Sequence, residues 1–336
     1  MSPRFHPRLI HGPFGDPGLF LPFMFEKRAL VFDLGDLSPL SSRDILKITH
    51  AFVTHAHMDH FIGFDAALRL FLGREKHLHV FGPRGMIRHV EGKLAGYEWN
   101  LAPNYETEFT LTAVEAGAGR MAARTFRGRD RFAPSGPLEE TPFSGVLLDE
   151  PGFFVRCAEL DHGIPCLGFL LEEKRHIHIS KAALDDMGLC PGPWIGAFKE
   201  AVLTGADLRA PLQARTTEGR GRIFPLGTLM EKIAIMAPGQ KIAYVTDAGF
   251  TPSNREKIID LALGADHLFI EATFSDKDSA LAEKKRHLTA RQAGRLAAGA
   301  GVGRFTLFHF SPRYYGMEAA IQKEAEESFG SAPISP

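Results

Sequence analysis

The segment His55–His60 reads His-Ala-His-Met-Asp-His and places three imidazoles and one carboxylate on a short stretch of chain. Imidazole nitrogens and carboxylate oxygens are the ligands that zinc and neighbouring divalent transition metals take in proteins. In a chain of this length with 15 histidines, this spacing arises by chance with a probability on the order of 10⁻³. A solvated histidine-rich turn is the alternative interpretation. The segment therefore predicts a metal-binding loop.

The residues around this loop predict rigid elements on both sides of it. Ala51–Val53 is a short apolar run typical of a strand. After the loop, apolar side chains recur at helical spacing and stop at Gly73: Phe64, Ala67, Leu68, Phe71 and Leu72. A strand before the loop and a helix after it would hold the candidate ligands in fixed positions.

Three more candidate ligands directly follow predicted strands. His162 follows the strand-like run ending at Leu160, Asp247 follows Ile242–Val245, and His309 follows Phe305–Phe308. Taken singly, each is more often a structural residue, because histidine is intermediate in burial and aspartate favours turns. Together with the loop they would supply enough ligands for two metals.

The rest of the chain predicts an α/β protein. Strand, loop and helix alternate in the first and last thirds, whereas residues 107–173 show the period of two that is typical of sheets. We expect a single domain over residues 1–336, built of two sheets covered by helices. Two segments, at about 115–142 and 172–227, look like insertions that project from it.

Composition excludes several classes of protein. There are 39 Lys and Arg residues against 40 Asp and Glu residues, a net charge of −1, so no global field attracts nucleic acid or a membrane. Three cysteines do not make a disulfide framework. No apolar run of signal-peptide or membrane-spanning type is present, so we expect a cytoplasmic protein with no membrane partner. Five arginines between Arg120 and Arg131 either contact RNA phosphates or lie on a solvated loop.

The order of the candidate ligands is similar to that of the metallo-β-lactamase superfamily. Four further segments resemble the ribonuclease Z family within it: Asp161–Pro165, Phe269–Phe274, Arg286–Ala293 and Leu307–Tyr314. The resemblance covers nearly the whole chain and implies an αββα sandwich, two mixed sheets flanked by helices. Leu184–Pro193 is similar to the Gly-Pro stretch of the family's protruding tRNA-binding arm, although a plain turn fits equally well.

The chain also departs from that family. His11–Pro17 stands in place of the usual Gly-rich first loop, and Asp33–Asp36 in place of a longer acidic turn. The arm's Lys-Gly pair is missing near Ala201–Gly205. The chain is therefore expected to be a divergent member.

The resemblance implies a role for each candidate ligand. His55, His57 and His162 would hold one metal, Asp59, His60 and His309 the other, and Asp247 would bridge them. Both ions are expected to be zinc, with manganese or iron as the alternatives. A carboxylate can bridge two metals where a neutral imidazole cannot, which agrees with this assignment.

Further residues are implied to act in catalysis or substrate binding. Asp59 could also accept a proton from water, and His287 is the candidate acid for the leaving alkoxide, oriented by Glu271. Ser311 and Arg313 follow the last ligand, where an arginine fork could grip phosphate oxygens; a surface salt bridge is the alternative for Arg313.

Two enzymatic functions are consistent with these residues. The first is a phosphodiesterase resembling ribonuclease Z, in which a metal-activated water attacks a phosphodiester, with tRNA precursors processed at their 3′ ends. The second is a hydrolase of small substrates such as cyclic nucleotides, thioesters or lactones, using the same metals. A silent binding protein is disfavoured because every ligand position is filled. A homodimer is left open.

Overall fold

The computed structural model describes residues 4–24 and 26–331, and the chain divides into two compact units. Among the described residues, Arg4, Leu148–Val155 and Leu171–Gln240 form the smaller unit, and the remainder form the larger unit. All candidate ligands belong to the larger unit. No helix in the described part of the chain has the length and apolar character needed to cross a bilayer.

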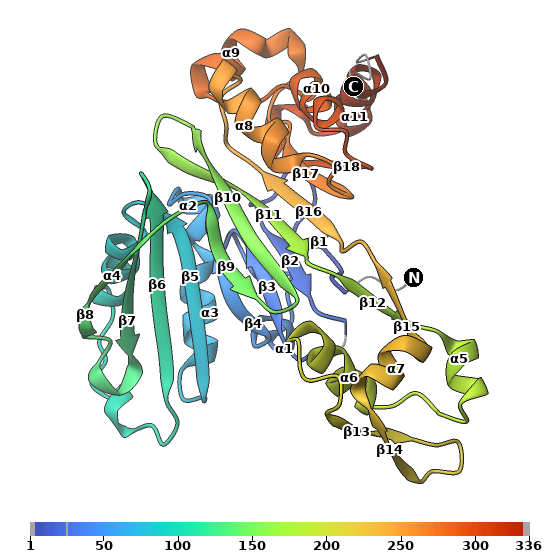
Figure 1. Ribbon diagram of the computed structural model, residues 1–336. Helices are drawn as coiled ribbons and strands as arrows, with labels where there is room; N and C mark the ends of the chain where they lie inside the picture. The colour runs from blue at the N-terminus through green and yellow to red at the C-terminus, as the bar shows by residue number, and fades with distance from the viewer. Residues whose placement is uncertain (1–3, 25, 332–336) are drawn as a thin grey trace. The chain divides into compact units, whose positions relative to one another are not determined.

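The first sheet of the larger unit has eight strands that follow one another in chain order (Figure 1). The pairs from β3 to β6 are parallel, and the pairs at both ends are antiparallel. The strands are β1 (Arg8–Leu9), β2 (Leu19–Pro22), β3 (Ala29–Phe32), β4 (Ile48–Phe52), β5 (Lys76–Pro83), β6 (Phe109–Gly117), β7 (Arg120–Arg127) and β8 (Pro134–Pro142).

The second sheet has six strands in the order β18-β17-β16-β11-β10-β9, of which β16, β17 and β18 are parallel. Parallel strands end at the same edge of a sheet, so residues that follow them come together there. The strands are β9 (Val146–Glu150), β10 (Phe153–Asp161), β11 (Pro165–Glu173), β16 (Lys241–Val245), β17 (His267–Glu271) and β18 (Phe305–Phe308).

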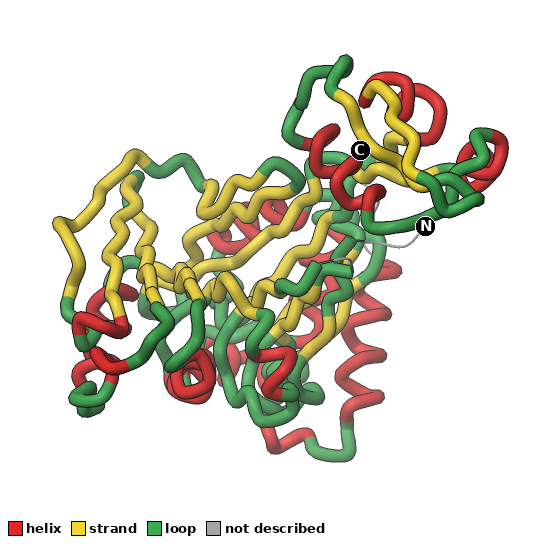
Figure 2. Tube along the Cα trace, turned by 90° about the horizontal axis from the view of Figure 1, so that it is seen from below, coloured by secondary structure: helices red, strands yellow, loops and turns green. Residues whose placement is uncertain are grey.

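Helices cover the sheets of the larger unit, and Figure 2 shows helices along one face of the first sheet. Apolar residues of α3 and α4 share a buried cluster with the first sheet, and those of α8, α10 and α11 share another with the second. The helices are α1 (Ser42–Ile45), α2 (Met58–Phe61), α3 (Gly63–Phe71), α4 (Met86–Ala95), α8 (Pro252–Ala262), α9 (Ser279–Lys285), α10 (Ala290–Gly299) and α11 (Glu318–Ser331), with single turns η1 (Ala102–Asn104), η2 (Gly128–Asp130), η3 (Asp276–Asp278) and η4 (Pro312–Tyr314).

Aromatic side chains pack between the two sheets. The ring of Phe32 on β3 lies 5.2 Å from that of Phe169 on β11 and 5.7 Å from that of Tyr244 on β16, measured between centroids. The backbone N–H of Leu167 donates to the carbonyl of Thr54 at 2.9 Å. The larger unit is therefore an αββα sandwich, which confirms the expected fold class. The strands and helices predicted around the candidate ligands are confirmed as well.

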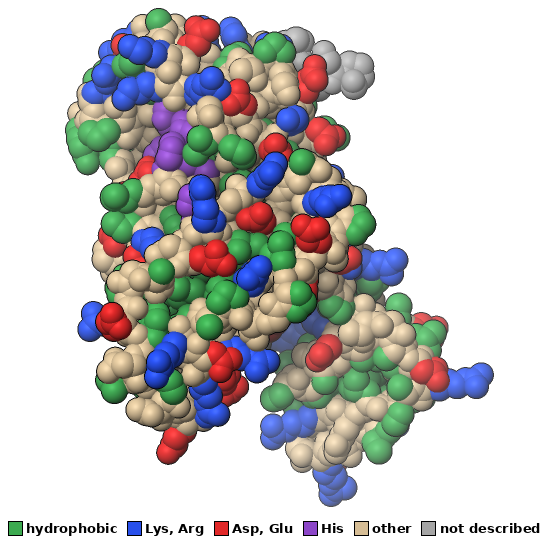
Figure 3. Space-filling view, turned by 90° about the vertical axis from the view of Figure 1, so that its left-hand side faces the viewer, with side chains coloured by type: hydrophobic (Ala, Val, Ile, Leu, Met, Phe, Trp, Pro, Cys, Tyr) green, Lys and Arg blue, Asp and Glu red, His purple; other side chains and the backbone are tan. Residues whose placement is uncertain are grey.

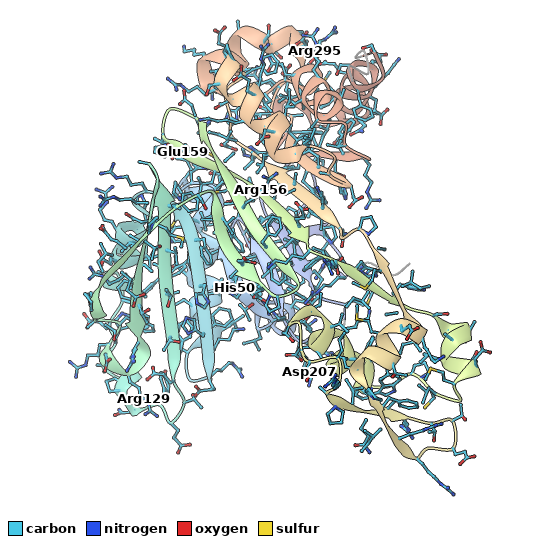
Figure 4. The ribbon with its side chains drawn as sticks, viewed as in Figure 1. His50, Arg129, Arg156, Glu159, Asp207 and Arg295 are labelled. Atoms are coloured by element: carbon cyan, nitrogen blue, oxygen red, sulfur yellow. The ribbon has the colours of Figure 1, made fainter. Side chains whose placement is uncertain are left out.

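The two segments expected to be insertions have regular structure. Residues 115–142 contain the end of β6 and all of β7 and β8, so most of the arginines lie on strands of the first sheet. Nη1 of Arg120 lies 3.4 Å from Oε2 of Glu140. The guanidinium of Arg129, which Figure 4 labels, donates to the backbone carbonyl of Glu106. The charge of Arg120 is therefore partly balanced by a carboxylate, whereas the guanidinium of Arg129 contacts a backbone carbonyl.

The smaller unit has a core of its own. Ile177, Leu189, Phe198, Leu229 and Ile233 are among its buried apolar residues. Its first and last strands, β12 and β15, pair antiparallel, with His176 opposite Ala237 and Ile179 opposite Ala234. Its elements are β12 (His176–Ile179), α5 (Lys181–Asp186), α6 (Trp194–Leu203), β13 (Pro211–Arg215), β14 (Gly221–Pro225), α7 (Leu226–Ile233) and β15 (Ala234–Ala237).

Candidate metal centre

The histidine-rich loop leaves β4 and turns at once into α2 and α3. His55 and His60 are fully buried, whereas His57 is exposed and precedes the first residue of α2. Asp59 and His60, at the start of α2, offer ligand atoms that lie close to one of His309. The loop therefore directs His55 and His57 towards one group of candidate ligands and Asp59 and His60 towards another.

Each of the three other candidate ligands lies at the end of a strand of the second sheet, as the sequence predicted. His162 follows β10, Asp247 lies two residues after β16, and His309 directly follows β18. Asp247 and His309 have left-handed backbones, with φ of 50° and 59°. This conformation is uncommon for residues other than glycine, asparagine and aspartate, and it clusters at functional sites.

Asp247 lies between two groups of histidines. Its Oδ2 is 3.7 Å from Nε2 of His55 and 3.4 Å from Nε2 of His162. Its Oδ1 is 3.4 Å from Nε2 of His60 and 3.1 Å from Nδ1 of His309. Burial raises the pKa of this carboxyl, but His309 and His60 outweigh burial and hold it well below its usual range. The ionised carboxylate thus presents one oxygen to each group.

Three groups of close ligand atoms are present among the described residues, and two of them contain residues of the expected ligand sets; the third contains Asp247, Glu271, His287 and His309. One contains His55, His57, His162 and Asp247, with one ligand atom from each within 4.8 Å of the others. Another contains Asp59, His60 and His309, where Oδ2 of Asp59 lies 3.3 Å from Nε2 of His309. The structure brings all seven residues together.

The unsatisfied ring nitrogens test whether these residues fit a metal. Nε2 of His55 and Nε2 of His60 are buried and have no hydrogen-bond partner. An unpartnered buried nitrogen is costly unless a ligand occupies it. Burial lowers the pKa of His55 to about 2, so this imidazole is neutral, as a metal ligand must be. The donor set fits divalent ions.

The opposite ring nitrogens are held by the protein. Nδ1 of His60 lies 2.9 Å from Asp33, and Nδ1 of His55 lies 3.0 Å from Oγ1 of Thr54. Asp33 is fully buried and also accepts from the backbone of Thr54 at 2.7 Å and the hydroxyl of Tyr244 at 3.0 Å. Such partners fix the orientation of a metal-binding imidazole. The sequence interpretation missed this role of Asp33, although an aspartate directly after an apolar strand was a usable signal.

His287 and Glu271 form a pair beside the ligand cluster, where the ring of His287 lies next to those of His162 and His309. Nδ1 of His287 lies 2.8 Å from Oε2 of Glu271, which is fully buried and accepts from the backbone of Ala248 at 2.8 Å. Burial lowers the pKa of His287, but Glu271 more than compensates, so the pKa is raised. The ring centroids of His287 and His162 are 4.9 Å apart. The structure therefore places an imidazole that holds a proton at the edge of the ligand cluster.

A cavity of about 280 Å³ opens onto the ligands. Ser311 lines it, but Arg313 is not among its described lining residues; its Nη1 lies 3.9 Å from Asp278. Lys285 and Phe274 line the cavity, and the sequence interpretation did not identify them. Figure 3 shows histidine side chains gathered at one place on the surface.

Comparisons with known proteins agree with this geometry. Residues 204–310 match the family model described as a β-lactamase superfamily domain. Ribonuclease Z of Deinococcus radiodurans is 30% identical over 85% of this chain and 83% of the relative. The chain belongs to the ribonuclease Z family. Ribonuclease Z of Geobacillus kaustophilus is also 30% identical, over 83% of this chain and 75% of the relative.

Solved structures show the same fold. The metallo-β-lactamase fold protein YhfI from Bacillus subtilis gives a TM-score of 0.55 at 16% identity, over 97% of this chain and 94% of that chain. The short form of human tRNase Z gives 0.52 at 17% identity, over 92% and 93%. As a member of the ribonuclease Z family with the metallo-β-lactamase fold, the protein is a hydrolase of phosphodiester bonds with a divalent-metal site.

Proposed function

We propose that the protein is a two-metal endoribonuclease that cleaves tRNA precursors at their 3′ ends. His55, His57 and His162 would hold one ion, Asp59, His60 and His309 the other, and Asp247 would bridge them. The observation that carries this proposal is the position of Asp247, whose two oxygens face different histidine groups. Zinc suits ligands that are mainly imidazole nitrogens.

Bound divalent ions would lower the pKa of water and neutralise charge on the attacked phosphate. Asp59 would orient this water. Burial raises the pKa of its carboxyl, but a hydrogen bond with His309 and the charges of His60 and His309 lower it to about 2. Asp59 is therefore ionised at neutral pH and can accept a hydrogen bond from the attacking water.

His287 would supply the proton that the leaving group needs. Water forms a bond to phosphorus, the bond from phosphorus to a ribose oxygen breaks, and that oxygen takes the proton from His287. Glu271 raises the pKa of His287 and accepts from its Nδ1, so the proton for transfer lies on Nε2. Ser311 and Lys285 line the cavity where they can contact phosphate oxygens.

RNA is favoured as the substrate because relatives at 30% identity are named ribonuclease Z and are matched over at least three quarters of their length. The alternative is a small-molecule metallo-hydrolase acting on cyclic nucleotides, thioesters or lactones. The fold and metal ligands alone are compatible with both. The two functions differ in the substrate that the purified enzyme prefers.

The test compares a 3′-extended tRNA precursor, a cyclic nucleotide and bis(p-nitrophenyl) phosphate with the same metal-loaded protein. We expect the precursor to be cleaved at one position with the highest kcat/KM. The Asp247→Asn variant tolerates the left-handed backbone but lacks the bridging charge, so it should lose bound metal and activity on every substrate. A higher kcat/KM on the cyclic nucleotide, or full activity in Asp247→Asn, would contradict the proposal.

A further inference from the structure

A second hollow, of about 640 Å³, lies beside the metal-site cavity and shares His287 with it. This volume is within the range of sites that enclose small organic ligands. Its walls come from the loop after β16, the start of α8, helix α9 and the residues that follow α9. None of the seven candidate ligands lines it. The metal centre therefore does not account for this hollow.

The walls offer one aromatic ring and several charged groups. Phe250 is half-buried, with the guanidinium of Arg255 5.4 Å from its ring centroid. Arg286, Asp161 and Glu283, which are exposed, also line the hollow and add a guanidinium and two carboxylates. An apolar face together with hydrogen-bonding groups of both kinds suits a nucleoside, which has a flat base and ribose hydroxyls.

Arg286 caps the end of helix α9, and an ion pair with Asp161 holds its side chain on this wall. Its backbone is left-handed, with φ of 57°, a conformation that glycine adopts more readily. Its carbonyl lies 2.9 Å from Nδ1 of His162, and its Nη1 lies 2.6 and 2.8 Å from the two oxygens of Asp161. Glycine could supply the same carbonyl, so the contact with His162 does not explain an arginine here.

We propose that this hollow binds the nucleoside that carries the leaving oxygen, with its base stacked on Phe250. The inference rests on the proposed function: His287 protonates the leaving oxygen, and His287 is the residue shared by the two cavities. The phosphate would lie in the cavity that the candidate metal ligands line, on one side of His287, so the ribose attached to the leaving oxygen would extend into the second hollow. Asp161 and Glu283 accept hydrogen bonds from its hydroxyls or base, and Arg286 contacts the next phosphate.

The first test replaces single nucleotides of an RNA substrate by abasic residues, on each side of the cleaved bond in turn. The end groups of the products show which nucleoside carries the leaving oxygen. We expect the abasic residue on that side to lower kcat/KM roughly 10- to 100-fold, the range of one stacked base. Phe250→Ala should lower it similarly on intact RNA and have no further effect on that abasic substrate.

The matched control is Tyr105→Ala, which removes a partly exposed ring that lines neither cavity and should change nothing. Equal losses for Phe250→Ala on intact and abasic RNA would overturn the proposal. The proposal would also be overturned if kcat/KM fell only when the abasic residue lies on the other side of the cleaved bond, away from the leaving oxygen.

The second test measures binding without cleavage. An oligonucleotide with 2-aminopurine at the end that carries the released hydroxyl is titrated into the protein, and stacking is read as quenched fluorescence. We expect Phe250→Ala to abolish the quenching. Arg286→Gly, which suits the left-handed backbone, should weaken binding, reduce its salt dependence and leave metal content unchanged. Binding with quenching but no RNA cleavage would refute the proposed function alone, whereas cleavage without quenching would refute the subsite alone.

Discussion

His287 differs from the histidines of the ligand set because it is not one of the seven candidate ligands and has a carboxylate partner of its own, Glu271. The pair is joined at 2.8 Å, and Glu271 is fully buried. The five imidazoles of the candidate ligand set are expected to bind metal as neutral ligands, whereas His287 is outside that set and Glu271 raises its pKa. This contrast is the physical reason for assigning proton transfer to His287.

Changing His287 to Ala should leave metal content unchanged and slow RNA cleavage by roughly 10²- to 10⁴-fold. A ribose alkoxide is a poor leaving group and needs the proton. Hydrolysis of bis(p-nitrophenyl) phosphate should fall much less, because p-nitrophenolate leaves without one. Rates on both substrates and metal analysis check this. Equal losses on both would show that His287 has a positioning role, and a fall in metal content would show that it is a ligand.

Asp33 shows how a residue outside the ligand set can control the centre. It accepts from His60, Thr54 and Tyr244 while fully buried. The Asp33→Asn variant keeps the size of the side chain and can keep the left-handed backbone, but it cannot accept at both positions. We expect metal affinity to fall roughly 10- to 100-fold. Competition with a chelator measures it, and Tyr244→Phe, which removes one donor, should have a smaller effect. Unchanged affinity would mean that Asp33 only stabilises the fold.

At the scale of elements, the sequence predicted the strand ends because each ligand follows a run of apolar residues. His162, Asp247 and His309 could be placed in this way, and the structure brings them together. The sequence could not show which oxygen of Asp247 faces which histidines, because that depends on a left-handed backbone. It also could not show that Arg313 lies beside Asp278, because one turn, η4, decides the direction of that side chain.

The smaller unit and the arginine-rich strands were harder to predict for another physical reason. Residues 120–131 were interpreted by their charge, yet β7 is held by backbone pairing with β6 and β8, which no local charge pattern reports. The smaller unit has its own core, formed by residues far apart in the sequence, such as Ile177 and Ile233. The spacing of apolar residues in the sequence predicts single helices and strands. The boundary of a compact unit depends instead on packing between segments far apart in the sequence.

Strands β4 and β5 carry a stack of three histidines, of which Figure 4 labels His50. The ring of His50 lies 4.7 Å from that of His79, which lies 4.2 Å from that of His77. Burial, then the neighbouring His79, lower the pKa of His50 to about 3, and burial and His77 lower that of His79 to about 4. Burial also lowers the pKa of His77, so all three rings are neutral in the folded protein near pH 7.

This stack predicts that the free energy of unfolding falls as the pH drops below about 6.5, the value for an unfolded histidine. Below it the unfolded chain binds protons that the folded stack excludes, so unfolding is favoured, and the loss continues towards the folded pKa values of about 3 and 4. The loss from His50 should be on the order of 1–3 kcal/mol by pH 4. Denaturant unfolding at several pH values measures it. His50→Gln should show a shallower acid slope, and an unchanged slope would contradict the interpretation.

At the scale of the whole molecule, the metal centre and the smaller unit should be separable. Each has its own buried core, and all candidate ligands lie in the larger unit. Within the smaller unit, residues 180–233 lie between the antiparallel strands β12 and β15, where Ile179 is opposite Ala234. Adjacent strands lie about 5 Å apart, so a short linker can join these two residues.

We therefore expect a chain in which residues 180–233 are replaced by a short Gly-Ser linker to fold and bind metal. Hydrolysis of bis(p-nitrophenyl) phosphate should stay within a few-fold of the full protein, because the ligands are retained. Cleavage of a tRNA precursor should fall at least tenfold if the smaller unit contacts RNA, as the resemblance of Leu184–Pro193 to the family's arm implies. Undiminished precursor cleavage would assign RNA recognition to the larger unit alone.

The left-handed backbones of Asp247 and His309 lower the stability of the fold at two residues that the metal centre needs. Each costs about 1–2 kcal/mol relative to a relaxed conformation, and glycine would remove that cost. Selection for thermal tolerance of the metal-free chain would therefore favour glycine at these positions. The metal ligands there would be among the first residues lost. A laboratory evolution of this protein should keep an activity screen in every round, because its most stable descendants are expected to be inert.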